Sequence, residues 1–295
     1  MRYYDITLAP QGSSTPIKEW TSHPNGNYNP SAQEVEFDIL TAPFGTPVGA
    51  QAITIYGISL QELTNAQQFA GMNITISAGM KAGLPLANPK QSGVILVGTV
   101  WQSFGNWEGT EMTLDFVVVP SAYSLDNPGN IVLNWQANTP LSQALTQTLN
   151  TAYPDMTVTM NISDQLVLPN QEVHACSTLT QLAQYLQGMT KGYFLGENYG
   201  GVRITIQGGT IVVWDDTYQP DTVQINFTDL VGQPTWIEPN IMQAKFVMRA
   251  DLQLGSIITM PQGMQNSPGL FKTTAQSLPS SMKNQSSFQG SFRVN

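Results

Sequence analysis

The stretch GMNITISAGMKAGLPLANPKQSGVILVGTVWQSFGNWEG (residues 71–109) alternates like a β-strand, breaks at a segment rich in Gly and Pro, and resumes as an apolar strand that ends in aromatic residues. In its first part Met72, Ile74 and Ile76 alternate with polar residues, which is the period of a strand with one buried face. The stretch contains almost no side chain that could carry out chemistry. It predicts a β framework that specifies shape and not reactivity.

Strand patterns fill the rest of the first region, residues 1–120. Residues 34–40 alternate acidic and apolar side chains, so one face of this strand is expected to be buried. Further apolar strand candidates lie at residues 52–59, 94–101 and 112–119. Residues 59–62 (SLQE) form a capping-box pattern and predict a short helix with Leu60 and Leu63 on its inner side. Several short strands with one small helix indicate a compact antiparallel β-barrel.

The middle region changes to a helical period. Thr139 is expected to cap a helix with Pro140 at its first position, and Pro154 is expected to stop it. A second helix is expected to begin near Ser177 and to end at Gly188. The apolar stripes of the two helices are Leu141, Ala144, Leu145, Leu149 and Ala152, and Leu179, Leu182, Ala183 and Leu186.

Residues 202–216 resemble a β-hairpin with a Gly-Gly turn, which completes a small α+β domain over residues 121–219. The last region, residues 220–295, is β again, with candidate strands at 222–227, 244–252 and 256–260. A long exposed loop is expected at 262–287, because that segment is rich in Ser, Pro, Gly, Asn and Gln. The final segment, 287–295, reads as a strand that either pairs back into the last barrel or supplies an edge to another chain.

The expected fold is therefore mainly β. Two tube-like antiparallel β-barrel domains, residues 1–120 and 220–295, are expected to flank the α+β domain of residues 121–219. A loose similarity between the two outer regions favours this arrangement. Both contain an aromatic residue in a Gly- or Pro-containing segment, FGNWEG and VGQPTWIEPN.

Charge is scarce in this chain. Only 11% of the 295 residues are charged, against about 25% in a typical soluble protein. Uncharged polar residues cost less to bury than ions, so this composition favours a subunit whose faces are covered by neighbours. The net charge of −9 argues against tight binding to a phosphate backbone, but it suits a passage through which DNA slides.

The chain is expected to fold in a reducing cytoplasm and to insert in no membrane. Its single cysteine, Cys176, excludes an internal disulfide. The first residues, MRYYDITLAP, lack the apolar core of a signal peptide. No apolar run approaches the roughly 20 residues that cross a bilayer.

A search for catalytic groups yields little. His23 and His174 are the only histidines, and the spacing of His174 and Cys176 would place both on one side of a strand. Asp215 and Asp216 are adjacent at a strand end, where they point to opposite faces and start a turn. Two histidines and one cysteine are too few for a zinc site with ordered spacing. We therefore expect no catalytic residues, no metal site and no cofactor.

The aromatic residues carry a stronger signal. Trp101, Phe104 and Trp107 occur in WQSFGNWEG, and Pro234 and Trp236 occur in GQPTWIEP. These residues are either core or turn anchors, or turn-borne anchors of a subunit interface, where aromatic residues are enriched. Stacking on sugars or bases is a third reading, although no basic groove accompanies it. We take the five residues as the predicted interface.

Two long segments bear a family resemblance. Residues 53–118, including ITIYGISLQEL, MNITISAGM, GVILVGTVW and MTLDFVV, resemble the first domain of baseplate hub proteins from contractile-tailed bacteriophages and related prophages. Residues 232–256, GQPTWIEPNIMQAKFVMRADLQLGS, resemble the second barrel of the same hubs. The motifs that carry the resemblance are turns and strands of the framework.

The resemblance implies a non-enzymatic, homotrimeric hub. Two barrels per chain give six around a three-fold axis, which matches a hexameric tail tube on one side and a trimeric spike on the other. The implied partners are other copies of this chain, the tail tube protein or tube initiator, the central spike, the tape measure protein and the baseplate wedge, with DNA passing transiently through the lumen. The implied location is the tail baseplate of the virion. A tail-tip cell-wall hydrolase and a carbohydrate-binding β module remain the alternatives.

Overall fold

The computed structural model describes residues 3–41, 51–80, 91–119, 129–238, 241–261, 288 and 290–294. The described residues are mainly β, with three α-helices, as the sequence predicts. The chain divides into two compact units. One comprises Tyr4–Ser77 and Val94–Tyr218, and the other comprises Met1–Tyr3, Ala78–Gly93 and Gln219–Asn295. The three domain boundaries proposed from the sequence stay a prediction.

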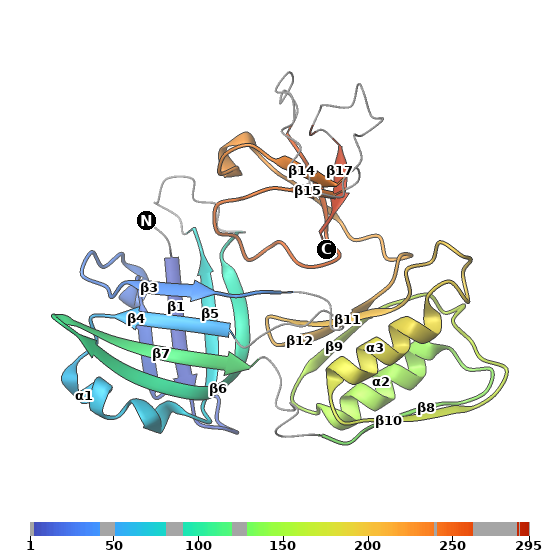
Figure 1. The fold of residues 1–295 in the computed structure, drawn as a ribbon, viewed down its shortest axis with the longest axis horizontal. Coiled ribbons are helices and arrows are strands. Elements are labelled where there is room, and N and C mark those ends of the chain that lie inside the picture. Colours follow the sequence, from blue (N-terminus) through green and yellow to red (C-terminus); the bar gives the residue numbers. More distant parts are fainter. Residues whose placement is uncertain are drawn as a thin grey trace. The chain divides into compact units, whose positions relative to one another are not determined.

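A seven-stranded sheet forms the first part of the fold. Its strands are β1 (Tyr3–Ala9), β2 (Lys18–Thr21), β3 (Val35–Asp38), β4 (Gln51–Tyr56), β5 (Asn73–Gly79), β6 (Gly93–Glu108) and β7 (Glu111–Val119). Their order is β2-β1-β5-β6-β7-β4-β3 (Figure 1). Alternate residues point into one apolar core, and Ile74 and Ile76 are fully buried there, as their spacing predicts.

The predicted closed barrel is not found among the described residues. The sheet begins at β2 and ends at β3, and these two edge strands do not pair with each other there. Each has only four residues, Lys18–Thr21 and Val35–Asp38, and each pairs on one side only. The sequence period identifies which face of a strand is buried, but it carries no information on whether the two edges meet.

A short helix, α1 (Leu60–Thr64), follows β4 and confirms the predicted capping box. The Ser59 hydroxyl accepts a hydrogen bond from the Glu62 backbone N–H at 3.2 Å, and the Glu62 carboxylate accepts one from the Ser59 N–H at 2.8 Å. Leu63 packs against the sheet core, but Leu60 is 55% exposed. The expectation for Leu60 was wrong because this single turn presents only one leucine to the sheet.

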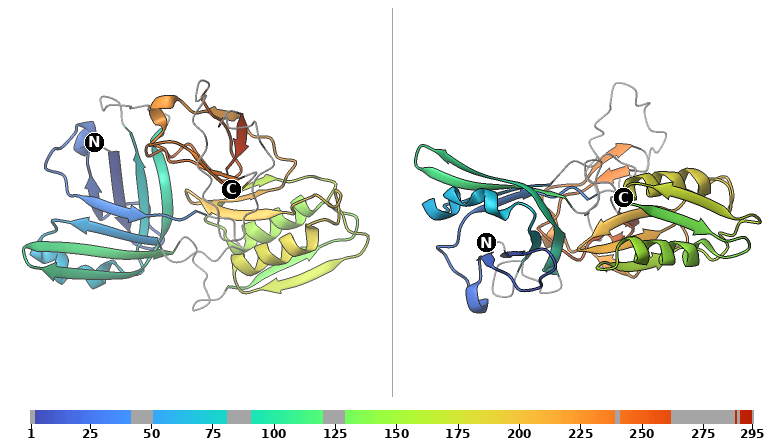
Figure 2. Two further views of the ribbon diagram at one scale, coloured as in Figure 1. Left: turned by 45° about the horizontal axis from the view of Figure 1, so that its top comes forward. Right: turned by 90° about the horizontal axis from the view of Figure 1, so that it is seen from below.

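Residues 129–218 form an α+β structure in three layers. Its elements are β8 (Ile131–Trp135), α2 (Leu141–Ala152), β9 (Thr157–Asn161), β10 (Glu172–Cys176), α3 (Leu179–Thr190), β11 (Arg203–Gln207) and β12 (Thr210–Trp214). Helix α2 contacts β8 and β9, and α3 contacts β10 and β11. The helix pair therefore lies between the ribbon β8–β10 and the sheet β11-β12-β9, as the views in Figures 1 and 2 show.

The predicted helix stripes are buried, whereas the predicted helix ends need correction. Helix α2 begins one residue later than expected, with Pro140 and not Thr139 at the cap position. Helix α3 continues through Gly188 to Thr190, because Gly188 keeps a helical backbone and the glycine with a left-handed φ is Gly192, at 71°, beyond the Lys191 cap. The predicted hairpin is confirmed: Gly208 and Gly209 have φ of 54° and 80°, as a type I′ turn requires.

The second compact unit, Met1–Tyr3, Ala78–Gly93 and Gln219–Asn295, is called the C-terminal unit, and it contains short strands around a small core. They are β13 (Thr222–Gln224), β14 (Thr235–Glu238), β15 (Ile241–Gln243), β16 (Ile257–Thr259) and β17 (Ser291–Arg293), with a 3-10 turn at Phe227–Asp229. Strand β16 pairs in parallel with β13 and antiparallel with β17, so the last strand pairs back within the chain. Ile225, Ile258 and Met260 form the buried core.

Three expectations for the last region change. Residues 244–252 form no strand, because Phe246 makes only an isolated bridge to Leu230 and the following residues enter a polar network described below. The strand order is mixed and no closed barrel is found among the described residues, in contrast to the predicted antiparallel barrel. The predicted loop at 262–287 lies outside the described residues.

Substitutions at two glycines test how closely β6 packs against β7 compared with the exposed face of α3. Gly188 lies exposed inside α3 with nothing within 4 Å of an added Cβ, whereas a Cβ at Gly98 in β6 would lie 2.5 Å from the Val119 carbonyl oxygen. We expect Gly188→Ala to raise the free energy of unfolding by about 0.5–1 kcal/mol. Gly98→Ala should lower it by about 1–3 kcal/mol. Urea denaturation of both variants measures the difference, and equal effects would contradict the packing of β6 against β7.

Candidate interaction surface

The hairpin of β6 and β7 positions three of the five predicted interface residues. Its two-residue turn is Gly109–Thr110, and Gly109 has a φ of 61°, as the first central position of a type II′ turn requires. Strand β6 runs without a break to Glu108, so Trp101, Phe104 and Trp107 are borne by the strand. The expectation that they sit on a turn was therefore wrong.

The register between the strands assigns each aromatic residue to a face. Phe104 is opposite Asp115, which lies between the buried Leu114 and Phe116, so Phe104 is on the outer face. Trp107 is opposite Met112, whose side chain packs against the core, so Trp107 is on the inner face but beyond the core. The two aromatic side chains therefore lie on opposite faces of one hairpin.

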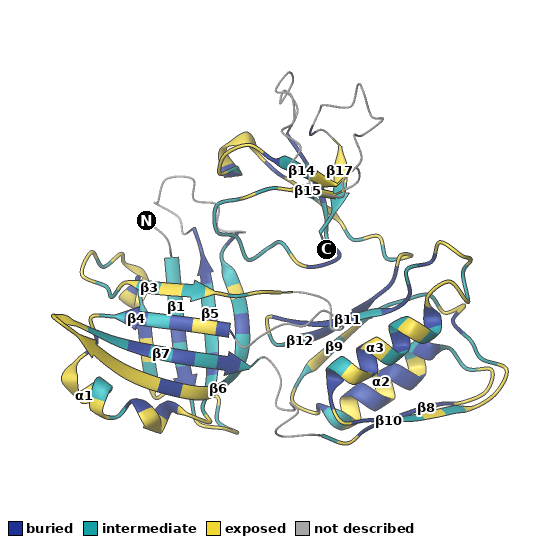
Figure 3. Cartoon of the chain, viewed as in Figure 1, coloured by how far each residue is buried: buried dark blue, intermediate teal, exposed yellow. Residues whose placement is uncertain are grey.

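Trp101 occupies an irregularity in the same strand. Val100 pairs with Val118 and Gln102 pairs with Val117, which leaves Trp101 as the extra residue of a β-bulge. Bulges re-aim side chains and increase local twist. The segment after the bulge is solvent-exposed toward the hairpin tip (Figure 3).

The aromatic side chains of the hairpin are exposed to a degree that is unusual for their size. The exposed fractions are 41% for Trp101, 46% for Phe104 and 62% for Trp107. The indole N–H of Trp107 donates a hydrogen bond to the Gly109 carbonyl at 3.1 Å, so its own turn orients the ring. Large exposed aromatic side chains that are already oriented are typical anchors of protein interfaces.

The carboxylate of Asp115, beside Phe104 on the outer face, joins three strands. Asp115 accepts hydrogen bonds from Thr54 at 2.6 Å, Asn106 at 2.5 Å and Thr113 at 3.2 Å, and these residues come from β4, β6 and β7. The contacts fix the outer face of the hairpin and give the exposed segment a rigid base.

Glu108 and Glu111 face each other across the turn. Both are exposed, and they are direct partners in the β6–β7 register. Like charges in directly opposite positions destabilise a hairpin. This pair was not among the residues expected from the sequence, although the spacing E-G-T-E around a turn glycine predicts it.

Pro234 and Trp236 lie in a different environment. Pro234 is buried, and the half-buried Trp236 in β14 stacks on Phe288 with ring centroids 6.0 Å apart. Phe292 also packs against Trp236 in an edge-to-face arrangement, with ring centroids 6.0 Å apart. Trp236 thus contributes to the aromatic packing of the C-terminal unit. The role of Pro234 and Trp236 at an interface stays a prediction.

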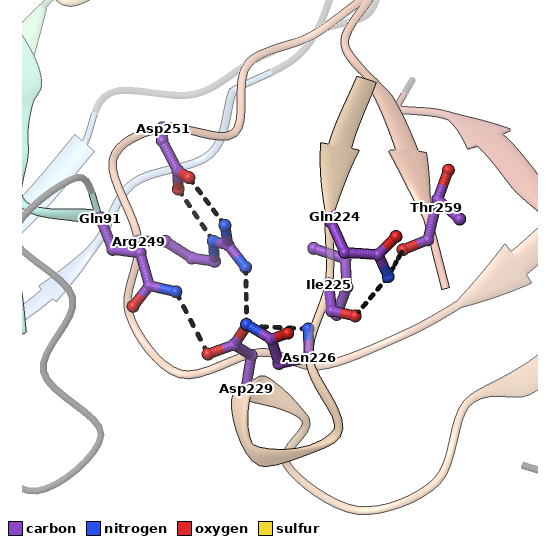
Figure 4. Close-up of polar contacts among 8 residues, drawn as sticks. All are labelled: Gln91, Gln224, Ile225, Asn226, Asp229, Arg249, Asp251 and Thr259. Atoms are coloured by element: carbon purple, nitrogen blue, oxygen red, sulfur yellow. Dashed lines mark hydrogen bonds and ion pairs between the residues drawn. The ribbon is translucent and has the colours of Figure 1, made fainter. Parts of the chain in front are cut away.

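A buried ionic network holds the C-terminal unit together (Figure 4). The guanidinium of Arg249 forms two hydrogen bonds with Asp251, at 2.8 and 2.7 Å, and an ion pair with Asp229 at 3.3 Å. The Arg249 side chain is only 4% exposed, and its hydrogen bonds to Asp251 raise the pKa of the guanidinium above its ordinary value. The Gln91 amide donates to Asp229 at 3.1 Å, and the Asn226 N–H donates at 3.0 Å to the other Asp229 oxygen.

The network links segments that are far apart in the sequence. Gln91 and Asp229 are separated by 138 positions, and the Ala250 N–H also donates to the Gln91 carbonyl at 2.7 Å. No sequence pattern identified this cluster. Its only signal was the placement of Arg249 and Asp251 in a segment with few other charges.

The candidate nucleophilic residues His174, Cys176 and His23 lie in surroundings that suit a structural role and not catalysis. His174 and Cys176 share one side of β10, as predicted. Cys176 is buried, and burial raises the pKa of its thiol, whereas a nucleophilic cysteine needs a lowered one. The His174 ring stacks on Tyr185 with centroids 3.6 Å apart. His23 is buried, and its Nδ1 lies 2.8 Å from the Ser22 hydroxyl.

The two adjacent aspartates also serve the fold. Asp215 is fully buried and accepts hydrogen bonds from the Ser163 N–H, the Tyr199 hydroxyl, and both the N–H and hydroxyl of Thr217. Burial and this hydrogen bond raise the pKa of Tyr199 strongly. Asp216 pairs with Arg203 at 2.9 Å. A carboxylate whose acceptor sites are filled has no free lone pair directed at a substrate.

The described part of the chain contains no group of three or more His, Cys, Asp or Glu side chains that could hold a metal ion. Within the same part, no helix is both long and apolar enough to cross a bilayer.

Comparison with known proteins gives remote structural likenesses only. No protein-family model and no curated protein matches the chain. A tail protein from Neisseria meningitidis MC58 aligns over 80% of this chain with 13% identity and a TM-score of 0.43. The 43 kDa tail protein of prophage MuSo2 from Shewanella oneidensis aligns over 78% with 14% identity and a TM-score of 0.45.

A third solved structure is an Escherichia coli component of the type VI secretion system, described as similar to the bacteriophage T4 tail proteins gp27 and gp5. It aligns over 78% of this chain with 10% identity and a TM-score of 0.43. The alignments span 60%, 61% and 67% of the three other chains.

Arg249 allows a test of the polar network. Removing it leaves the carboxylate of Asp229 buried without its cation, and we expect Arg249→Ala to lower the free energy of unfolding by about 3–5 kcal/mol. The matched control is Arg203→Ala, whose ion pair with the 39% exposed Asp216 should contribute about 0–1 kcal/mol. Urea denaturation and amide exchange of residues 225–247 measure both. Equal losses in the two variants would contradict the role of the network.

The raised pKa of Tyr185 makes the free energy of unfolding depend on pH in the alkaline range. Burial and the hydrogen bond to Glu172, 2.7 Å long, raise the pKa of Tyr185 from 10.0 to about 12. The folded state therefore holds this proton more tightly than the unfolded state. The resulting stabilisation is complete below pH 10 and is lost as the pH rises toward about 12. Tyr185→Phe should reduce the slope of unfolding free energy against pH in this window, and curves that stay parallel would refute the assignment.

Proposed function

We propose that this chain is a structural subunit of the baseplate hub of a contractile phage tail. It acts as a homotrimeric adaptor that joins the hexameric tail tube, or its initiator, to the trimeric spike. It lines the channel through which DNA passes, and it also meets the tape measure protein and the baseplate wedge. It has no catalytic activity and resides in the virion baseplate after folding in the host cytoplasm.

The exposed β6–β7 hairpin is the observation that carries this proposal. It lies within residues 53–118, the segment that resembles the first domain of the hub family. There the chain leaves three large aromatic side chains at 41–62% exposure on a rigid strand. Monomeric proteins rarely expose apolar surface of this kind unless it contacts a partner.

The remaining chemistry supports a structural role over the alternatives. Cys176 is buried with a raised pKa, and Asp215 is saturated with donors, so neither suits a hydrolase. A sugar-binding platform needs aromatic rings on one face, whereas Phe104 and Trp107 lie on opposite faces. The net charge of −9 favours passage of DNA over its binding.

The oligomeric state tests the proposal directly. Sedimentation of the purified protein, alone and with its proposed spike partner, should show an assembly with three copies of this chain. A chain that sediments only as a monomer in both samples would refute the hub role. Peptidoglycan clearing abolished by one Asp or Glu substitution would favour the hydrolase, and glycan binding lost on Trp101→Ala would favour the carbohydrate module.

A further inference from the structure

The tip of the β6–β7 hairpin combines three features that no contact among the described residues of this chain explains. Phe104 and Trp107 project from opposite faces and are 46% and 62% exposed. Glu108 and Glu111 face each other at the end of the hairpin. Neither carboxylate takes part in an ion pair within the described residues.

The placement of the two aromatic residues defines the shape of the partner. A flat surface can cover only one face of a hairpin, and it would leave either Phe104 or Trp107 in water. Apolar contact on both faces requires a slot with two walls. The turn that holds the Trp107 indole through the Gly109 carbonyl keeps the hairpin in a shape that can enter such a slot.

The two glutamates define the charge of the partner. Opposed carboxylates repel each other in the free hairpin, and removal from water would raise that cost unless cations met them. A partner with Lys or Arg at the end of the slot converts this repulsion into charge-assisted hydrogen bonds. The complementary surface is therefore apolar along its walls and basic at its floor.

A second copy of this chain does not offer that surface in its described part. That part contains six lysines and arginines, and three of them, Lys18, Arg203 and Arg249, are held in ion pairs with acidic residues of the same chain. The other three, Lys191, Lys245 and Arg293, come from separate segments.

We infer that residues 104–111 form a plug that inserts into a slot with apolar walls and a basic floor on a different protein of the assembly. This inference rests on the proposed function, because the hub role places neighbouring tail proteins around the chain. It adds the chemistry of the partner surface and separates this contact from the contacts between copies.

Photo-crosslinking in purified tail assemblies tests the plug from both sides. A benzoyl-phenylalanine at position 104 or at position 107 should crosslink to the same other tail protein, at two segments that flank Lys or Arg residues. The same probe at position 193, replacing the 70% exposed Tyr193 outside the hairpin, is the control. Crosslinks only to other copies of this chain, from one face only, or no more than at position 193 would overturn the inference.

Binding measurements with the protein identified in this way complete the test. Trp107→Ala should weaken binding by roughly 30-fold or more, as loss of an interface anchor does, and Tyr193→Ala should leave it unchanged. The double variant Glu108→Lys with Glu111→Lys should abolish binding, and Lys or Arg to Glu changes at the crosslinked site of the partner should restore it. Failure of this rescue would overturn the basic floor.

The outcome also separates this inference from the hub proposal. The hairpin variants should sediment with the same number of copies as the unmodified chain, because the plug contacts a different protein. A trimer that persists without any such crosslink refutes the plug and leaves the hub intact. A chain that is always monomeric refutes the hub.

Discussion

The register between β6 and β7 is the constraint on which the surface of this protein depends. It places the side chains of Leu114, Phe116 and Val118 on the buried inner face of the sheet and those of their neighbours on the outer face. Because side chains alternate with a period of two, a slip by one residue would turn this whole set outward. The same register then continues past the end of the core, where the described residues leave the inward-facing Trp107 62% exposed. The exposed plug is thus a direct extension of the strand pattern that builds the core.

Polar contacts hold together the parts of the molecule where apolar burial is limited. In the C-terminal unit, Arg249 and Asp229 connect residues 226–251 with Gln91, which lies 138 positions before Asp229, beside a core of three buried apolar residues. In the α+β part, Asp215 draws donors from three separate segments through Ser163, Tyr199 and Thr217. Such buried networks add little net stability, but they penalise arrangements that leave a charge unpaired. In a chain with only 11% charged residues, several of the few charges serve to select one arrangement.

The sequence predicts local structure well where a repeating pattern decides it. The strand alternation at residues 72–77, the stripes of α2 and α3 and the capping box at Ser59 all follow from short-range periodicity. Parallel pairing of β12 with β9 and of β13 with β16 joins distant segments, so no local pattern shows it. Residues 244–252 look apolar enough for a strand, but Arg249 and Asp251 are drawn into the buried network instead.

The surface is only partly encoded in patterns that can be read from one sequence. The aromatic cluster at residues 101–107 is visible, but its exposure depends on how far β6 outruns the core, which is a property of the whole sheet. An exposed aromatic hairpin also carries a risk, because apolar strands associate with one another. The opposed Glu108 and Glu111 reduce that risk, since two copies cannot bring their tips together without adding four carboxylates in one place. The two carboxylates that disfavour contact between hairpin tips are therefore the same two that, under the plug proposal, select a basic partner surface.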